Sequence, residues 1–341
     1  MSHPLLTIPF AGLLLLQAVP AQHDTKGKDA QAKDAAAAVR IDAAIKAYKP
    51  VEGVSGSLKS IGSDTMNNEM AAWAEGFKKF YPSVKVEIEG KGSGTAPTAL
   101  EAGTAHFGPM SRAMKKEEMD KFEKKFGYKP TEVRTSLDVL AVYVHKDNPL
   151  KTLTLQQVDA IFGKNRRGGA KADLRTWGDL GLGGEWRDKP ISLYGRNSAS
   201  GTYGYFKEHA LFKGDFKDEV KEQPGSSAVV QAVASDKFAI GYSGIGYKTA
   251  DVRAVALSNK AGEPAADATM DNAYSGDYPL ARYLLVYVNK TPNKPLDPLR
   301  EQFLAYVLSR DGQEVVVKEG YIPLPGAIVT EERSKLGLDK P

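Results

Sequence analysis

Residues 57–66 read SLKSIGSDTM, and this stretch sets the pattern from which the rest of the fold can be worked out. Ser57 to Ile61 has the composition of a short strand, which ends in a turn at Gly62. Large apolar side chains then recur at spacings of four and three residues, as on one face of a helix. They are Met66, Met70, Trp73, Phe77 and Phe80. The stretch therefore predicts a strand, a glycine turn and a helix that packs against a sheet.

The same order of elements follows directly afterwards. Residues 84–88 alternate apolar and polar side chains as in a strand, and residues 90–95 form a second glycine turn. Residues 96–103 then predict a short helix, and residues 105–108 predict a third strand. A β-α-β-α-β order predicts a parallel sheet that is covered by helices.

Two long apolar runs, residues 138–144 and 283–288, predict buried strands that could carry the chain between two lobes. Further elements are expected between and after these runs. They are helices over residues 155–162, 202–211 and 300–309, strands over 191–194 and 239–242, and a turn over 195–201. Strands that alternate with helices place the chain in the α/β class.

The composition argues against several kinds of protein. The 341 residues include 46 Lys and Arg against 42 Asp and Glu, and the formal net charge of +4 does not favour nucleic-acid binding. The absence of cysteine excludes disulfides, thiolate zinc sites, a cysteine nucleophile and a lipid anchor. The five histidines are not spaced as a local metal-binding motif. We therefore expect no cofactor and no metal.

The two ends of the chain differ from its middle. An apolar run over residues 8–16, followed by small residues up to Ala21, predicts a signal peptide over residues 1–21 and export to the periplasm. Because no Lys or Arg precedes this run, a buried apolar N-terminus is the alternative. We expect no membrane insertion, since the run is too short to span a bilayer. Residues 22–53 predict an Ala-, Lys- and Asp-rich spacer, and residues 331–341 a polar end that frays.

Three loops rich in Gly, Ser and Thr each follow a predicted strand and precede a predicted helix. They span residues 62–65, 92–95 and 195–202. A helix N-terminus offers unpaired N–H donors and a partial positive charge, and hydroxyl groups add further donors, so each loop suits an oxyanion. Helix capping alone would explain any single loop. The three together favour a binding site, because ligands of α/β proteins bind at the carboxyl ends of parallel strands.

Arg196 adds a guanidinium group to the third loop. Its planar fork can donate to two oxygens of one anion, and a surface arginine is the alternative. None of the loops has the spacing of a P-loop, and the sequence contains neither a nucleophile elbow nor a convincing Ser-His-Asp order. The loops therefore predict binding of an anion.

Five motifs resemble those of the periplasmic phosphate-binding proteins of ABC phosphate importers. They are GSDTM at 62–66, GSGT at 92–95, FGPMSR at 107–112, Arg-x-x-x-Ser-Gly-Thr at 196–202 and AIGY at 239–242. The resemblance extends from about Val54 to Gly326. It implies an α/β type II periplasmic-binding-protein fold, with two lobes that each hold a central, mostly parallel sheet and are joined by two crossing strands. We expect lobe one to comprise residues 54–144 and 281–341, and lobe two residues 145–280.

The resemblance also implies roles for individual residues. Thr65 and Ser93 resemble hydrogen-bond donors of lobe one, while Arg196 and residues 200–202 resemble the clamp of lobe two. These groups would bind a dehydrated phosphate ion between the lobes.

The resemblance leaves two candidates for the acidic group of the site. Some members carry, just after the third strand, an acid that accepts the proton of hydrogen phosphate, but here Ser111 and Arg112 occupy that place. Asp64 and Asp138 are the remaining candidates, and we favour Asp138 because other members with Ser-Arg carry an Asp in the long strand. The full predicted phosphate-binding set is Ser63, Asp64, Thr65, Ser93, Gly94, Thr95, Ser111, Arg112, Asp138, Arg196, Ser200, Gly201 and Thr202.

The implied function is capture of inorganic phosphate by a secreted, monomeric protein that delivers it to the membrane permease of an ABC importer. We expect no catalysis and no nucleic-acid partner. A different tetrahedral oxyanion, such as sulfate, molybdate or tungstate, is the main alternative. A secreted phosphatase or phosphotransferase and a surface adhesin are further alternatives. An acid in the site favours phosphate, because sulfate has no proton to share with a carboxylate.

Overall fold

The computed structural model describes residues 41–339. The predicted signal peptide, residues 1–21, and the first part of the predicted spacer, residues 22–40, lie outside the described residues. Within residues 41–339, none of the helices combines the length and the apolar character needed to cross a membrane.

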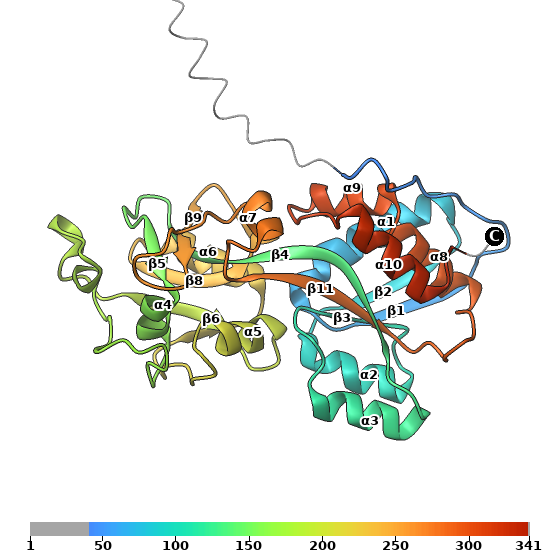
Figure 1. The fold of residues 1–341 in the computed structure, drawn as a ribbon, viewed down its shortest axis with the longest axis horizontal. Coiled ribbons are helices and arrows are strands. Elements are labelled where there is room, and N and C mark those ends of the chain that lie inside the picture. The colour runs from blue at the N-terminus through green and yellow to red at the C-terminus, as the bar shows by residue number, and fades with distance from the viewer. Residues whose placement is uncertain (1–40, 340–341) are drawn as a thin grey trace, which may run out of the picture. The chain divides into compact units, whose positions relative to one another are not determined.

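Strands and helices alternate along the described chain (Figure 1). The strands are β1 (Ser57–Ile61), β2 (Lys85–Glu89), β3 (Phe107–Met110), β4 (Thr131–His145), β5 (Thr152–Thr154), β6 (Ser192–Arg196), β7 (Lys221–Gln223), β8 (Ala239–Gly244), β9 (Val252–Ala254), β10 (Ala256–Ser258) and β11 (Ala281–Val288). The α-helices are α1 (Asn67–Phe80), α2 (Ala96–Ala102), α3 (Lys116–Phe126), α4 (Leu155–Phe162), α5 (Gly201–His209), α6 (Ser226–Ser235), α7 (Met270–Ser275), α8 (Pro298–Val307), α9 (Arg310–Lys318) and α10 (Gly326–Leu336).

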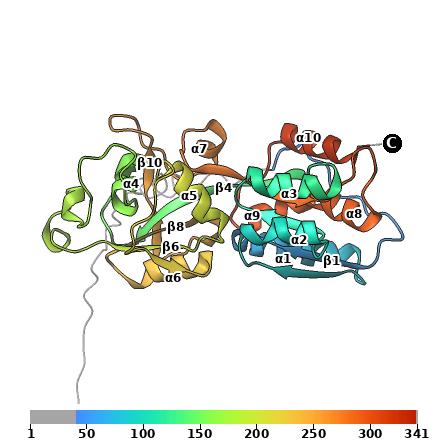
Figure 2. The ribbon, with the colours of Figure 1, turned by 90° about the horizontal axis from the view of Figure 1, so that it is seen from below.

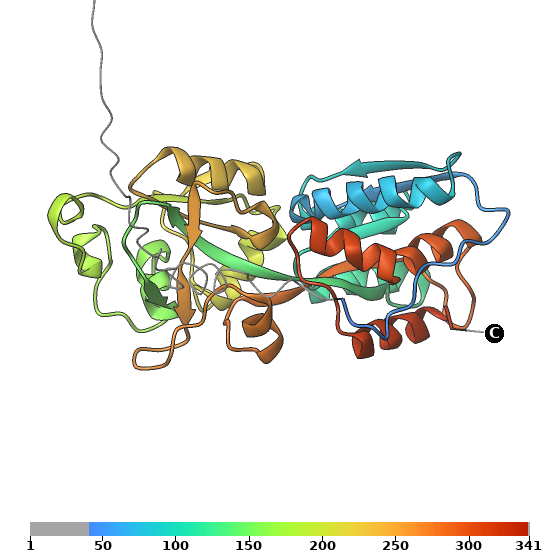
Figure 3. The same cartoon turned by 90° about the horizontal axis from the view of Figure 1, so that it is seen from above.

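The first half of the main sheet has the strand order β2-β1-β3-β11-β4. β1 pairs in parallel with β2 and with β3, which confirms the predicted parallel arrangement, and β11 runs antiparallel to β3 and β4. The apolar face predicted around α1 is buried from Met66 to Phe77, whereas Phe80 at the end of the helix is 37% exposed. α1 packs beside α9, so helices cover this half of the sheet (Figure 3).

The second half of the sheet has the order β4-β8-β6-β7, and β9 also pairs with β4. β6 is parallel to β7 and β8, and α5 and α6 contact these strands (Figure 2). α4 has the bounds that the sequence predicts. α5 ends at His209, earlier than the predicted Leu211, and the chain turns where Phe212 and Lys213 adopt the left-handed backbone conformation.

β4 and β11 run between the two halves of the sheet (Figure 1). Residues 131–139 of β4 pair with β11, and residues 140–144 pair with β8. β4 begins at Thr131, well before the predicted start at Asp138. Polar and apolar residues are mixed in its first part, so a search for a continuous apolar run finds only the second part.

Residues 41–53, which the sequence assigns to the spacer, form an N-terminal strap that packs against the sheet and its helices. Ile45 and Tyr48 are buried, and the Tyr48 hydroxyl lies 2.8 Å from both the Tyr81 hydroxyl and Gln302 Oε1. Packing therefore begins before residue 54, through isolated buried side chains that give no periodic pattern in the sequence.

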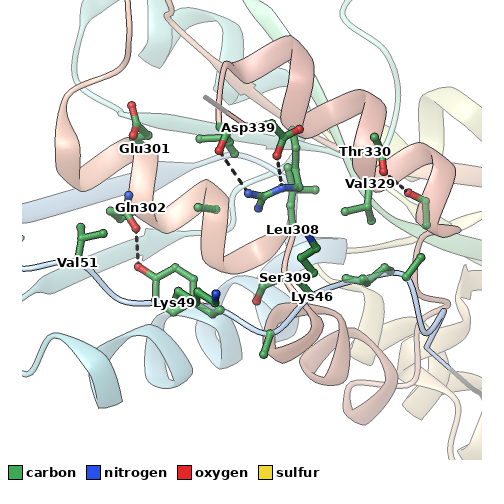
Figure 4. A pocket seen from close by; sticks show the side chains of 18 residues that line it. Lys46, Lys49, Val51, Glu301, Gln302, Leu308, Ser309, Val329, Thr330 and Asp339 are labelled. Carbon is green, nitrogen blue, oxygen red and sulfur yellow. Dashed lines mark hydrogen bonds and ion pairs between the residues drawn. The ribbon is translucent and has the colours of Figure 1, made fainter. Parts of the chain in front are cut away.

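A pocket of about 580 Å³ lies between the strap and helices α8 and α10 (Figure 4). None of the predicted site residues lines it.

Residues 331–336 do not fray as predicted, because they belong to α10, and residues 340–341 lie outside the described residues. Leu336 is buried, and the buried Glu332 side chain pairs with Arg134 of β4. The local sequence is polar, and it does not reveal an ion pair with a distant strand.

Candidate anion-binding site

Four helices begin close together, each after a strand of the parallel parts of the sheet. Two short 3₁₀ turns, Asp64–Met66 after β1 and Ser93–Thr95 after β2, lead into α1 and α2, while α5 follows β6 and α6 follows β7. Thr65 Oγ1 lies 2.8 Å from Thr202 Oγ1 of α5 and 3.5 Å from Ser226 Oγ of α6. The structure thus brings the three predicted loops together and adds a fourth, at α6.

The loops of the two halves approach each other closely. Gly94 N donates to the carbonyl oxygen of Ala199 at 3.0 Å. A Cβ atom on Gly201 would lie 2.2 Å from Ser93 Oγ and 2.6 Å from Ser111 Oγ. A glycine at position 201 is therefore required by the contact between the loops.

Hydroxyl groups at this junction accept hydrogen bonds from the protein. Ser93 Oγ accepts from Ser111 N at 3.0 Å, and Thr202 Oγ1 accepts from Arg282 Nη2 at 2.8 Å. A hydroxyl has one hydrogen to donate and two lone pairs. Each of these oxygens keeps one hydrogen to donate, within reach of a neighbouring hydroxyl oxygen: Thr65 Oγ1 lies 2.8 Å from Thr202 Oγ1, and Ser111 Oγ lies 3.3 Å from Ser93 Oγ.

Arg196 ends β6 and is 2% exposed. Its Nη1 donates to Ser226 Oγ at 2.7 Å and lies 3.2 Å from Asp64 Oδ2. Its Nε is buried and has no hydrogen-bond partner within residues 41–339. Burial lowers the pKa of Arg196, and the neighbouring Asp64 carboxylate opposes this shift. The arginine thus places an unused, charged N–H donor among the hydroxyl groups.

Asp64 joins the first 3₁₀ turn to the start of α6. Its Oδ2 accepts from Ser226 N at 2.8 Å, in addition to the ion pair with Arg196. The Tyr247 hydroxyl donates to the carbonyl oxygen of Asp64 at 2.8 Å, and the Tyr321 hydroxyl donates to that of Thr65 at 2.7 Å. Two tyrosines therefore fix the backbone of the turn that carries Asp64 and Thr65.

Asp138 is fully buried and forms an ion pair that sequence reasoning missed. Its Oδ2 accepts from Arg282 Nη2 at 2.7 Å and Nε at 3.1 Å, and its Oδ1 accepts from Ile245 N at 2.9 Å. Arg282 also donates to Thr202 and to the carbonyl oxygen of Ser111, so it belongs to the site. The signal in the sequence that could have identified Arg282 is its position, as a charged residue, directly before the long apolar run that forms β11.

Ser63 and Ser200 support the site indirectly. Ser63 Oγ donates to Ser111 Oγ at 3.0 Å. Ser200 caps α5, since its Oγ accepts from Thr202 N at 3.1 Å. Ser226, the second residue that the sequence reasoning missed, follows Gly225 at the start of α6, and this Gly-Ser pair before a helical pattern was the available signal.

Thr95 and Arg112 are predicted site residues whose side chains bind elsewhere in this structure. Thr95 Oγ1 donates to the carbonyl oxygen of Gly92 at 2.8 Å. The Arg112 guanidinium donates to both carboxylate oxygens of Glu118 on α3, at 2.8 and 2.7 Å. Neither side chain contacts the hydroxyl groups that meet at the junction.

The junction as a whole offers many donors for one small anion. Two arginines, several hydroxyl groups and helix N-termini meet there, and two carboxylates balance part of the positive charge. Among residues 41–339, no group of three or more His, Asp or Glu side chains is placed to hold a metal ion.

Comparisons with known proteins agree with this description. Residues 47–311 match the family model described as PBP superfamily domain. The chain is 58% identical over 304 residues to the phosphate-binding protein PstS of Pseudomonas aeruginosa. The aligned region covers 89% of this chain and 94% of that protein. It is 30% identical over 288 residues to PstS of Staphylococcus saprophyticus, with 82% and 84% covered.

A solved structure from Clostridium perfringens is also similar. It shows a substrate-binding protein, assigned to a phosphate ABC transporter, with bound phosphate. The TM-score is 0.67 at 30% sequence identity, and the match covers 79% of this chain and 100% of that one.

The strand order and these likenesses define the class of protein as a substrate-binding protein with the α/β type II periplasmic-binding-protein fold, which confirms the fold that the sequence predicts. The relatives are named as binding proteins and not as enzymes. Within this class, the chain belongs to the PstS family of phosphate-binding proteins.

Proposed function

We propose that this protein captures inorganic phosphate between two lobes and delivers it to the membrane permease of an ABC importer. The gathering of hydroxyl groups is the observation that carries the proposal. Ser93, Thr202 and Ser226 each accept a hydrogen bond from the protein, and the one hydrogen of each hydroxyl would turn from a neighbouring hydroxyl oxygen to a ligand that only accepts. The names of the relatives in Pseudomonas and Staphylococcus support the same ligand.

The two halves of the sheet are the proposed lobes, with lobe one formed by residues 54–144 and 281–341 and lobe two by residues 145–280. The N-terminal strap packs on lobe one through Tyr48, which bonds to Tyr81 and Gln302. Opening and closing would bend β4 and β11, because these strands run between the lobes. Residues 1–21 would direct export to the periplasm, where the protein would act as a monomer and without a nucleic-acid partner.

The phosphate ion would lie where the four loops meet. Direct donors would be the hydroxyl groups of Thr65, Ser93, Thr202 and Ser226, the Arg196 guanidinium, and backbone N–H groups at the start of α5. Ser63, Gly94, Ser111, Ser200 and Gly201 would hold these donors in place. Thr95 and Arg112 would lie at the edge of the site.

The two carboxylates would have different roles. Asp64 holds the lobes together, because its Oδ2 binds Ser226 N and Arg196 of lobe two. Asp138 is the proposed acceptor for the proton of hydrogen phosphate, since Arg282 pairs with it and its Oδ1 accepts a single bond, from Ile245 N. Sulfate cannot donate such a bond, and a polar mismatch of this kind can discriminate by about 10⁴-fold. This role of Asp138 separates the proposal from sulfate binding.

The experiment is a calorimetric titration with phosphate after ligand has been removed by unfolding and refolding. We compare the unchanged protein with Arg196→Gln and with a control, Arg253→Gln. Arg253 is another arginine of lobe two, partly buried, and it donates to the carbonyl oxygen of Asn148 at 2.8 Å, away from the junction. Loss of about 100-fold or more in affinity is expected for Arg196→Gln only. No binding to the unchanged protein, or an equal loss in both variants, would contradict the proposal.

A further inference from the structure

Arg282 and Asp138 face each other across β11 and β4. The pair lies where β4 changes partner, because Val139 is the last residue that pairs with β11 and Leu140 the first that pairs with β8. This is the point at which the two strands pass from one half of the sheet to the other (Figure 1). The ion pair therefore lies where the two halves of the sheet are connected, and it bonds to residues of the second half, Ile245 and Thr202.

The guanidinium of Arg282 is bonded in several directions. Besides Asp138, it donates to the carbonyl oxygen of Ser111 at 2.6 Å and to Thr202 Oγ1 at 2.8 Å. Its centre lies 5.1 Å from the Tyr205 ring, and the Tyr205 hydroxyl donates to the carbonyl oxygen of Ala281 at 2.8 Å. Arg282 itself is 6% exposed. Its position and its donors are therefore fixed by the protein, with no need for a ligand.

We propose that Arg282 is a positioning residue for anion capture, which orients a hydroxyl donor of each lobe toward the ligand, the donor of lobe two only when the lobes are together. The proposal rests on the proposed function. In lobe two Arg282 acts directly, since it occupies a lone pair of Thr202 Oγ1. The Thr202 hydrogen, which lies within reach of Thr65 Oγ1 at 2.8 Å, would then turn to the anion. A hydroxyl that accepts from a charged donor also becomes a stronger donor.

In lobe one Arg282 acts through the backbone. It binds the carbonyl oxygen of Ser111, whose own N–H donates to Ser93 Oγ at 3.0 Å. Arg282 thus holds in place the residue whose N–H donates to the Ser93 hydroxyl oxygen. One guanidinium at the hinge thus sets donors that come from two different lobes, and it loses its bond to Thr202 when the lobes separate.

A kinetic consequence distinguishes positioning from simple attraction of the anion. Attraction by charge acts on the association rate and weakens with salt. A contact that exists only in the closed form acts on the dissociation rate. Arg282→Lys keeps the charge and loses the fork, so we expect an unchanged association rate and a dissociation rate raised by about tenfold or more.

The test measures phosphate binding by calorimetry and phosphate dissociation by stopped flow. Removal of Arg282 alone leaves Asp138 as an unpaired buried charge and endangers folding. Arg282→Gln is therefore combined with Asp138→Asn and compared with Asp138→Asn alone. Arg134→Gln combined with Glu332→Gln is the matched control, because Arg134 of β4 pairs with the buried Glu332 of α10 outside the junction.

A double-mutant cycle with Thr202→Val, carried in the Asp138→Asn protein, provides the decisive readout. If Arg282 acts through Thr202, Arg282→Gln weakens phosphate binding by about 10- to 100-fold when Thr202 is present. The loss is smaller by about threefold or more when residue 202 is Val, because only the route through Ser111 and Ser93 remains. Equal effects in both backgrounds, or an Arg282→Lys protein with unchanged dissociation, would overturn the inference while phosphate binding stands. Absence of phosphate binding in the unchanged protein would overturn the proposed function, and this inference with it.

Discussion

Gly201 lies so close to Ser93 that a Cβ atom at position 201 would come within 2.2 Å of the Ser93 hydroxyl oxygen. The two residues belong to different halves of the sheet, and each lies at the start of a helix. Their contact shows that the loops meet backbone to side chain, with no room for an additional methyl group. This closeness makes position 201 a direct probe of the contact between the loops.

Gly201→Ala is expected to lower phosphate affinity by about 100-fold or more while the protein stays folded. The residue is the first of α5, where alanine is a good helix former, so the defect would come from the blocked approach to Ser93. Calorimetry and a thermal melt measure the two properties. Gly204→Ala, on the same helix, is the control, because its Cβ would meet only the flexible Arg112 side chain, at 3.3 Å. Equal affinities for the two variants would contradict this explanation.

The two carboxylates can be separated by their effect on selectivity. Asp138→Asn should reduce the preference for phosphate over sulfate by about 10²-fold or more, because the amide offers a donor to an ion that has no proton to share. Asp64→Asn should weaken both anions alike, since Asp64 acts between the lobes through Ser226 and Arg196. Competition titrations with both anions give the ratios. A loss of selectivity in the Asp64→Asn variant alone would contradict this assignment and would show that Asp64 accepts the phosphate proton.

Glu69 predicts a dependence of stability on pH that has nothing to do with the ligand. The side chain is fully buried on α1, and burial raises its pKa well above the ordinary value of 4.5, with Ser136 opposing the shift and Asp138 adding to it. The folded protein therefore binds this proton more tightly than the unfolded chain, so the stabilisation present below pH 4.5 is lost as the pH rises through the raised value.

Glu69→Gln should remove this loss. We expect the variant to match the unchanged protein near pH 4 and to be more stable at pH 8, on the order of 1 kcal/mol or more. Urea unfolding at the two pH values measures the difference. Parallel pH profiles for the two proteins would show that Glu69 is ionised in the folded state, contrary to this account.

The N-terminal strap predicts a change in stability without a change in binding. Tyr48 is buried, and its ring centroid lies 5.5 Å from that of Tyr306. Its hydroxyl forms hydrogen bonds with Tyr81 and Gln302. Tyr48→Ala should lower the free energy of unfolding by about 3 kcal/mol and leave the phosphate affinity unchanged. Denaturant unfolding and calorimetry on the same sample test both parts. A free strap, as the predicted spacer would be, gives no loss of stability.

The local patterns in the sequence predicted much of the fold, because residues 57–110 and 155–162 carry their periodicity within a few neighbours. The strap and α10 could not be predicted in this way, since Tyr48 and Glu332 are held by partners far away in the sequence. The same distinction between local and distant partners applies to the candidate site. Loops with Gly, Ser and Thr before helices can be recognised from the local sequence. Arg282, in contrast, comes to lie beside Asp138 only through the register of β11 with β4.

Arg112 is a case in which packing sets the direction of a predicted site side chain. A motif next to the site suggested a ligand-binding side chain, but Glu118 of α3 lies close enough to bind both arms of its guanidinium. Such competition between partners depends on where α3 packs, and no local pattern contains it. The sequence therefore indicates which loops meet at the junction, whereas the direction of each side chain within them depends on packing.

The central claim is that this junction binds phosphate and rejects sulfate. The measurement that tests it most directly is a calorimetric titration of the refolded, ligand-free protein with phosphate in the presence of excess sulfate. The account predicts tight phosphate binding with one ion per chain and no displacement by sulfate. Binding of both anions with similar affinity, or no binding of phosphate, would contradict it.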